Sequence, residues 1–309
     1  MQDIIQRIKS NDHLALSRII SKVENEESIP DSFFIDIHPA TLNPIRLGIT
    51  GPPGVGKSTL TERLINKILE DGLSVGVVAI DPTSPFSGGS VLGDRVRMNS
   101  FSDDDRVFIR SMGSHGDLGG LSKKAEDAGD IIGASGKDYI LFETVGVGQG
   151  EIEIANVADI TLVVLSPESG DEVQFMKAGL LEIADVYVLN KSDRPGGNQL
   201  EALITSMVQL NQDRNDINHP IVKTEANSGE GIDELYEGLK TYYQQLNEKG
   251  IIKSKRIKRC KHRVYNLIKD DLLGNFWSKG KKSKLDEFTQ KIDTDKKSPH
   301  ELAQILLTS

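Results

Sequence analysis

Short apolar segments alternate with longer amphipathic ones through the middle of this 309-residue chain. The apolar segments are rich in Val and Ile, and most are separated by stretches whose apolar residues recur at helical spacing. Strands buried on both faces of a parallel sheet have such continuous apolar runs. The pattern therefore predicts an α/β fold with a doubly wound, mostly parallel sheet. The predicted strands are residues 45–50, 74–80, 107–110, 138–143, 160–165, 186–190 and 221–224.

Both ends of the chain have helical rather than alternating patterns, so we expect an N-terminal helical extension over 1–44 and a main domain over 45–245. The extension carries apolar residues at helical spacing, and its predicted breakers are Pro30, Pro39 and Pro44. Residues 246–309 are expected to form a C-terminal helical arm. Its first helix is basic between Lys253 and Arg263, and its predicted apolar face holds Ile257, Cys260, Val264, Leu267 and Ile268.

The charge, the cysteine content and the length of the apolar stretches exclude several classes of function. A formal net charge of -9 and an isoelectric point near 5.3 argue against nucleic acid as the main partner, because binding a phosphate backbone needs a dense cationic surface. The single cysteine, Cys260, excludes an internal disulfide and a thiolate metal cluster. No stretch approaches the roughly 20 apolar residues of a membrane-spanning helix. We therefore expect a soluble, cytoplasmic protein without a membrane partner.

A glycine-rich segment directly follows the first predicted strand and matches the phosphate-binding pattern G-x-x-x-x-G-K-[ST]. It consists of Gly51, Pro52, Pro53, Gly54, Val55, Gly56, Lys57, Ser58 and Thr59. An amphipathic helix is predicted over 60–70, so backbone N–H groups at its start can surround phosphate oxygens. Lys57 would neutralise phosphate charge, and the Ser58 hydroxyl would bind Mg²⁺. The alternative is a glycine-rich turn before a helix, without a ligand.

The sequence Asn190-Lys191-Ser192-Asp193 follows the sixth predicted strand, where a base-recognition loop is expected. The carboxylate of Asp193 can accept hydrogen bonds from N1–H and the exocyclic amine of guanine, whereas adenine offers no amine there. Asn190 would fix the loop or reach the base, and the aliphatic part of Lys191 would cover the ring. These residues predict GTP rather than ATP. A polar turn at a strand end is the alternative.

A second candidate for the base pocket follows the seventh strand. Backbone N–H groups of Ala226 and Asn227, next to Glu225, could complete the pocket, although an ordinary strand-to-helix turn would have the same composition.

Glu143 ends the fourth predicted strand and is followed by glycines, which places a carboxylate near the γ-phosphate in the Walker B role. In common small GTPases a water-orienting Gln directly follows the corresponding glycine. Here Val147 follows Gly146, and Gln149 lies two positions further along. We therefore expect slow intrinsic hydrolysis that a partner or a dimer contact accelerates.

The long segment 81–95 carries two more candidate magnesium ligands, Asp81 and Asp94. Each can bind the ion directly or through water. The alternatives are a loop-initiating carboxylate for Asp81 and a helix N-cap for Asp94. Lys177 lies near another predicted helix start at the nucleotide edge, where the alternative is a solvated lysine.

Several longer segments resemble the MeaB/ArgK GTPases, a family that includes the methylmalonic aciduria type A protein. The resemblance runs nearly end to end, and its specific parts are the segment 79–98 (AIDPTSPFSGGSVLGDRVRM) and ETVGVGQ at 143–149. Further matching segments are NDHLALSRIISKVEN, FIRSMGSHGDLGGLS, SGDEVQFMKAGLLEIADVYVLNKSD and NSGEGIDEL. Two positions depart from the family pattern, because Gly150 and Glu225 stand where serine is usual.

The resemblance implies a chaperone of cobalamin-dependent acyl-CoA mutases, in which GTP binding and hydrolysis gate adenosylcobalamin loading and the exchange of damaged cofactor. It implies a magnesium-linked set of Ser58, Asp81, Asp94 and Glu143, and a third switch that contains Lys177. Lys57, Glu143, Asp94 and Lys177 are thus the candidate catalytic residues. Methylmalonyl-CoA mutase is the expected client, and the family implies a homodimer with contacts from the C-terminal arm.

Three other functions are compatible with a P-loop. A nickel or cobalt metallochaperone GTPase would need histidine or cysteine clusters, but the chain has one cysteine and six scattered histidines. A transport-associated ATPase or kinase conflicts with the guanine-type sequence at 190–193. A nucleic-acid-binding GTPase would use the basic stretch 253–263, which is more simply explained as a solvated helix face.

Overall fold

The computed structural model describes residues 1–81, 98–101, 103–113, 120–144, 150–167, 179–212, 218–290 and 297–308. The chain divides into two compact units, Met1–Lys255 and Arg256–Ser309. Each unit has its own architecture. Across the described residues, no helix is both long enough and apolar enough to cross a membrane.

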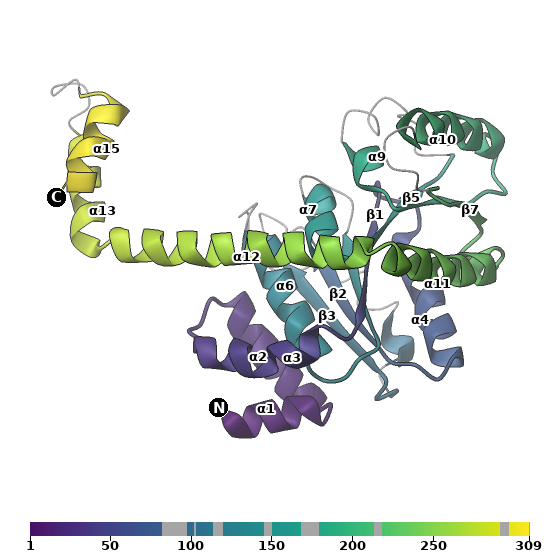
Figure 1. Cartoon of the computed structure of the whole chain (residues 1–309), viewed down its shortest axis with the longest axis horizontal. Coiled ribbons are helices and arrows are strands. Elements are labelled where there is room, and N and C mark those ends of the chain that lie inside the picture. Colours follow the sequence, from purple (N-terminus) through teal and green to yellow (C-terminus); the bar gives the residue numbers. More distant parts are fainter. Residues whose placement is uncertain are drawn as a thin grey trace. The chain divides into compact units, whose positions relative to one another are not determined.

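A seven-stranded sheet in the order β3-β2-β4-β1-β5-β6-β7 forms the centre of the first unit (Figure 1). Every pairing between these strands is parallel, which confirms the predicted fold class. β1 lies between β4 and β5, so the strand order reverses at β1 and the loop after it lies at a topological switch point. The strands are β1 (Ile45–Thr50), β2 (Val75–Asp81), β3 (Val107–Gly113), β4 (Tyr139–Thr144), β5 (Ile160–Leu165), β6 (Val186–Asn190) and β7 (Ile221–Thr224).

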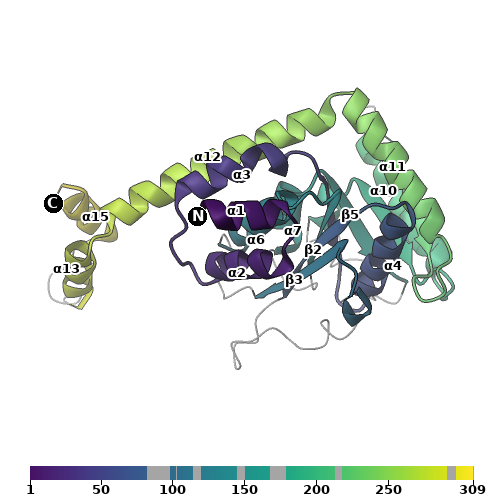
Figure 2. The same ribbon diagram turned by 90° about the horizontal axis from the view of Figure 1, so that it is seen from below.

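Alternate strand residues pack against helices on both faces of the sheet. On one face, Tyr139 and Leu141 belong to the core formed with α4 (Lys57–Glu70) and α11 (Ile232–Glu248). On the other face, Ile140 and Phe142 pack with the helices that are drawn beside β2 and β3 in Figure 2. These are α1 (Gln2–Lys9), α2 (His13–Glu24), α3 (Asp31–Thr41), α6 (Gly120–Gly133) and α7 (Gly150–Val157). The same strand therefore serves two cores, as the doubly wound pattern predicts.

Three further helical elements lie wholly within the described part of the first unit, and one of them covers the sheet near β6. α10 packs on the face opposite α11 through Leu200, Ile204 and Val208, against Val163 and Tyr187. The bounds are η1 (Met98–Phe101), α9 (Leu180–Ile183) and α10 (Gly197–Gln212).

The N-terminal extension differs from its predicted form at Pro39. This proline lies inside α3 rather than ending a helix. Proline within a helix lacks the N–H that bonds to the preceding turn, and isolated sequence reasoning therefore treats it as a breaker. Here Phe33 and Ile37 of α3 are fully buried against the sheet layer, so packing keeps the segment helical.

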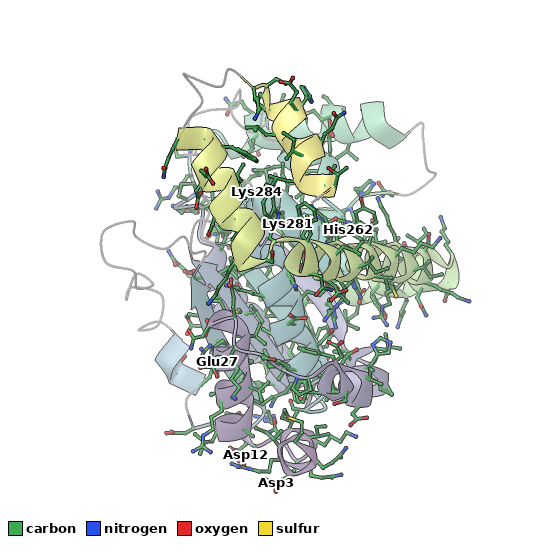
Figure 3. All side chains as sticks on the ribbon, turned by 90° about the vertical axis from the view of Figure 1, so that its left-hand side faces the viewer. Asp3, Asp12, Glu27, His262, Lys281 and Lys284 are labelled. Carbon is green, nitrogen blue, oxygen red and sulfur yellow. The ribbon has the colours of Figure 1, made fainter. Side chains whose placement is uncertain are left out.

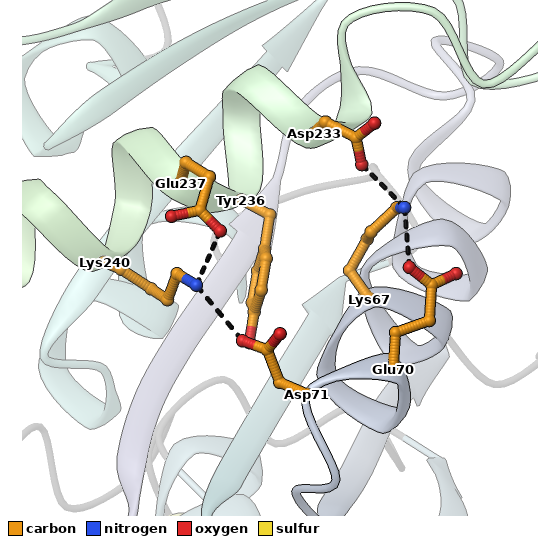
Figure 4. A network of polar contacts seen from close by, with 7 residues as sticks. All are labelled: Lys67, Glu70, Asp71, Asp233, Tyr236, Glu237 and Lys240. Atoms are coloured by element: carbon orange, nitrogen blue, oxygen red, sulfur yellow. Dashed lines mark hydrogen bonds and ion pairs between the residues drawn. The ribbon is translucent and has the colours of Figure 1, made fainter.

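A polar network joins α4 to α11 (Figure 4). The ammonium of Lys67 lies 2.6 Å from Asp233, and the Tyr236 hydroxyl donates to Asp71 over 3.0 Å. Lys240 adds an ion pair to the same aspartate at 3.1 Å. The helix that follows the glycine-rich loop is therefore tied to α11 by polar as well as apolar contacts.

The second unit is helical and basic. It contains most of α12 (Ile251–Phe276), together with α13 (Lys279–Gln290) and α15 (Pro299–Thr308). Residues 256–309 include 13 lysines and arginines against seven acidic residues; Figure 3 shows His262 on α12 and Lys281 and Lys284 on α13. Several large apolar side chains of α12 are exposed, namely Ile257, Val264, Tyr265, Leu267, Ile268, Leu272 and Leu273.

Candidate nucleotide-binding site

The glycine-rich loop lies at the carboxyl end of β1 and leads directly into α4, which begins at Lys57. Gly51 has φ +144°, and a Cβ added there would lie 2.1 Å from the carbonyl oxygen of Val164. This close approach to β5 allows only glycine. The loop is thus held against the sheet with the helix N-terminus behind it, the geometry that directs N–H groups at a phosphate.

Lys57 is buried and its Nζ lies inside this loop. It donates to the carbonyl oxygens of Gly51 and Pro52 over 2.7 and 2.8 Å. The loop carbonyls therefore hold the ammonium at the centre of the loop, where it can exchange one carbonyl for a phosphate oxygen.

Two hydroxyl contacts join the carboxyl end of β4 to the start of α4 and to the end of β1. The Ser58 hydroxyl donates to Glu143 Oε1 over 2.6 Å, and the buried Thr144 hydroxyl donates to Thr50 Oγ1 over 3.0 Å. Ser58 and Glu143, which the family resemblance places in one magnesium-linked set, thus lie in contact. They supply one hydroxyl and one carboxylate oxygen, the donor types that Mg²⁺ prefers.

Asn190 connects the glycine-rich loop to the base-recognition region. Its Nδ2 donates to the Val55 carbonyl over 2.8 Å, and its Oδ1 accepts from the Ala226 N–H at 3.0 Å and the Thr224 hydroxyl at 3.1 Å. A Cβ on Gly56 would lie 2.4 Å from the same Nδ2. Three segments far apart in sequence therefore meet at one buried amide.

The turn after β6 places the other predicted base residues. Lys191 has φ +57°, a left-handed conformation that few non-glycine residues adopt, and the Ser192 N–H donates to the Thr224 carbonyl over 3.2 Å. Asp193 is exposed. The turn thus leaves this carboxylate accessible to a ligand.

The segment after β7 forms a closed turn. The Gly229 N–H donates to the Glu225 carbonyl over 2.8 Å, and Glu225 forms an isolated antiparallel bridge with Glu230. Ser228 Oγ donates to the Glu225 backbone carbonyl over 3.1 Å and lies 3.2 Å from the Glu225 carboxylate. Of the two predicted amides, the Ala226 N–H already meets Asn190, whereas Asn227 is exposed.

Several predicted residues are not brought into this arrangement by the structure. Asp94 and Lys177 lie outside the described residues, as do Val147 and Gln149, and Asp81 is described only as the last residue of β2. Sequence reasoning in turn missed Thr50, Thr144 and Thr224. They carry no motif, because a buried threonine at a strand end has the same local pattern as any β-branched core residue.

A glycine-rich loop that leads into a helix N-terminus, at the switch point of a parallel sheet, defines a P-loop nucleoside triphosphatase. Comparison with known proteins identifies the family within this class. A family model described as "Methylmalonyl Co-A mutase-associated GTPase MeaB" matches residues 16–281. The chain belongs to this MeaB family and is a GTPase.

Three relatives of this chain illustrate the similarity. A putative GTPase of Pyrococcus abyssi (strain GE5 / Orsay) is 40% identical over 310 residues, which cover 99% of this chain and 96% of the relative. GTPase ArgK of Escherichia coli (strain K12) is 32% identical over 288 residues, 90% and 86% of the two chains. The mouse (Mus musculus) mitochondrial methylmalonic aciduria type A homolog is 37% identical over 235 residues, 75% and 57%.

A solved structure titled as a LAO/AO transport system kinase matches with a TM-score of 0.71 and covers 99% of this chain and 96% of that one. Its sequence is 24% identical. It supports the fold alone.

Proposed function

We propose that this GTPase is a nucleotide-gated chaperone of a cobalamin-dependent acyl-CoA mutase, with methylmalonyl-CoA mutase as the first candidate client. The observation that carries the proposal is the match of residues 16–281 to the mutase-associated family. In this function GTP binding and hydrolysis gate adenosylcobalamin loading, protection and reactivation of the mutase. The GTPase acts through protein contact and need not hold the cobalamin.

In the proposed nucleotide site, loop N–H groups and Lys57 bind the phosphates, and Asp193 reads the guanine edge. Ser58 and Glu143 would hold Mg²⁺, with Asp81 and Asp94 as further candidate ligands. Bound there, the ion would neutralise charge on the β- and γ-phosphate oxygens. The 2.6 Å contact between Ser58 and Glu143 supports this assignment, because it brings two oxygen ligands to one point.

Hydrolysis is proposed to be slow in the isolated chain and faster with a partner. The sequence has Val147 where small GTPases carry a water-orienting glutamine. Asp94 and Lys177 are proposed to complete the catalytic set. A single-turnover rate that is already fast for the monomer would contradict this part of the proposal.

A homodimer through the second unit is the proposed assembly. The exposed apolar residues of α12 recur at helical spacing, which is unusual for a helix that remains solvated along its whole surface. A second copy of the chain would bury them.

The central test measures retention of the mutase. The chain is immobilised with GTP, with a non-hydrolysable GTP analogue or with GDP, and purified apo and cobalamin-loaded methylmalonyl-CoA mutase are passed over it. We expect retention to differ between the triphosphate and diphosphate states, and adenosylcobalamin transfer to the apo mutase to follow the same order. The matched control is Lys57→Ala. Equal absence of retention in every state, in a chain that still hydrolyses GTP, would overturn the proposal.

A further inference from the structure

Arg63 lies on α4, two turns beyond the glycine-rich loop, and its guanidinium reaches the turn after β7. Its Nε donates to the Ala226 carbonyl over 2.8 Å, and its Nη2 donates to the Asn227 carbonyl over 2.7 Å. The two donors lie on one edge of a rigid planar group, so the two carbonyls must face the same direction. The contact is therefore specific to arginine.

Those two carbonyls determine where the following N–H groups point. A trans peptide is planar, and its N–H is directed opposite to its C=O; the described chain contains no cis peptide. With the carbonyls of Ala226 and Asn227 directed at Arg63, the N–H groups of Asn227 and Ser228 must point away from α4. Arg63 acts on this single turn as basic residues act at helix C-termini, where they bind the last carbonyls.

The same turn is held from its opposite side by Asn190, which accepts the Ala226 N–H at 3.0 Å and donates to Val55 in the glycine-rich loop. Arg63 belongs to the helix that this loop begins. The turn is thus fixed at two points. One is Asn190, which is hydrogen-bonded to the glycine-rich loop, and the other is Arg63, which lies on the helix that follows this loop. Its N–H groups, those of Asn227 and Ser228, are thereby held pointing away from α4.

We propose that Arg63 is a positioning residue for guanine recognition, which holds the 226–228 turn so that its N–H groups donate to O6 of the base. The inference rests on the proposed placement of the base beside Asp193 and the β7 turn. Asp193 reads N1–H and the 2-amino group, and the turn reads O6. Arg63 touches neither the base nor the reacting phosphate.

The test compares GTP with 6-thio-GTP, which keeps N1–H and the 2-amino group but replaces O6 by sulfur, a weaker acceptor. The wild-type chain should bind GTP about tenfold more tightly than 6-thio-GTP, the ratio expected for one good hydrogen bond. In Arg63→Met this preference should fall to about twofold or less, with GTP affinity about tenfold lower. Arg63→Lys should recover only part of it, because an ammonium cannot reproduce the two-donor edge.

The kinetic readout separates positioning from catalysis. Arg63→Met should raise KM for GTP and leave kcat at saturating GTP within about twofold, because the phosphate end of the site is unchanged. The matched control is Arg106→Met, since Arg106 also donates to a carbonyl of α4, that of Leu69, over 3.1 Å. It should leave both affinities unchanged.

The possible results separate the role of Arg63 from the position of the base site. The preference for GTP over 6-thio-GTP is a ratio, so a partly inactive sample does not alter it, and Arg63→Gln replaces Arg63→Met if the latter fails to fold. An unchanged ratio in the Arg63 variant overturns the role of Arg63. A wild-type chain that does not prefer GTP over ATP overturns the proposed base site itself.

Discussion

At the residue scale, Asn190 connects the glycine-rich loop to the segment that follows β7. Its buried amide satisfies the Val55 carbonyl, the Ala226 N–H and the Thr224 hydroxyl. Replacing it leaves three buried polar groups without their partner, and each such group costs about 1–3 kcal/mol. The residue therefore supports the stability of the first unit and the shape of the nucleotide site together.

Asn190→Ala is expected to lower the free energy of unfolding by about 3 kcal/mol and to weaken GTP and GDP binding by more than about tenfold. Urea denaturation and nucleotide titration measure the two effects. Asn190→Asp is the matched control, because it keeps the acceptor for Ala226 but places a carboxylate oxygen against the Val55 carbonyl. Loss of nucleotide affinity in Asn190→Ala alone would contradict the link to the glycine-rich loop.

A second residue-scale prediction concerns Lys137, which precedes β4 at the end of the sheet opposite the glycine-rich loop. Burial lowers the pKa of its ammonium to about 8, although Nζ donates to the Asp105 carbonyl over 2.9 Å. The unfolded chain therefore binds more protons than the folded chain between pH 8 and about 10.5. Within this window, rising pH stabilises the fold through Lys137.

Comparison with Lys137→Met isolates this contribution. The free energy of unfolding of the wild-type chain should rise relative to the variant between pH 8 and 10, by up to about 1.4 kcal/mol per pH unit. Urea denaturation at pH 7.5, 8.5 and 9.5 measures the difference. Parallel curves for the two proteins would show that the lysine keeps its ordinary pKa in the fold.

Sequence reasoning identified residues at this scale where each one belongs to a recognisable local motif. Ser58 was assigned to Mg²⁺ from the P-loop pattern and Glu143 from its place at the end of a strand, and the family resemblance placed both in one magnesium-linked set; the structure brings them into contact. Arg63 was not found. A half-buried arginine on an amphipathic helix has the same pattern as a solvated one, and its two carbonyl partners lie more than 160 positions away.

At the element scale, the contact between α4 and α11 combines exposed and buried polar groups (Figure 4). Asp233 is 81% exposed, so its ion pair with Lys67 is screened by solvent. The Tyr236 ring is buried, and its hydroxyl meets Asp71. The hydrogen bonds from Lys240 and then Tyr236 lower the pKa of Asp71. Its stabilising effect is therefore present at neutral pH and lost on acidification.

Two substitutions should separate these contributions. Lys67→Met is expected to change Tm by less than about 2 °C, because exposed ion pairs contribute little. Tyr236→Phe should lower Tm by about 2–4 °C, since it removes a donor held in a packed position. Differential scanning calorimetry at pH 7 measures both. A larger effect from Lys67→Met would mean that the exposed pair determines how α4 is held.

Element boundaries were predicted best where burial is continuous. All seven strands lie where the apolar runs predicted them, but β3 continues to Gly113, beyond the predicted end at Arg110. The extra residues, Ser111, Met112 and Gly113, do not form a continuous apolar run, and they pair with the end of β2 as far as Asp81. Pairing with a neighbour extended this edge strand, and no local apolar signal shows such pairing. The same applies to α3, which tertiary packing maintains through Pro39.

At the scale of the whole molecule, the second unit carries a charge of opposite sign to the chain as a whole, with 13 basic and seven acidic residues in a chain of net charge -9. The sequence predicted its helices and its apolar face. The family resemblance implied dimer contacts from this arm, and the described structure leaves the apolar face exposed within one chain. The proposed homodimer is therefore testable without disturbing the nucleotide site in the first unit.

Ile268→Asp should shift the chain from dimer to monomer in sedimentation velocity, because it places a carboxylate among the exposed apolar residues of α12. GTP affinity should stay within about twofold, since the first unit holds the site. Lys269→Ala is the matched control, because it changes the net charge by the same amount one position along the helix. A dimer that survives Ile268→Asp would exclude this face as the interface.

The packing of the three N-terminal helices also sets an order of events during synthesis. Ile8, Leu16 and Phe33 leave the ribosome before the seven strands of the sheet, yet they are buried with Ile140 and Phe142 of β4. At a synthesis rate of about 5–20 residues per second, this apolar segment waits roughly 5–20 seconds for its partners. Its long-range contacts also slow folding, because distant segments must meet before the core closes. Until β4 has been made, the apolar residues of the segment 1–41 therefore lack these partners and can associate with other chains.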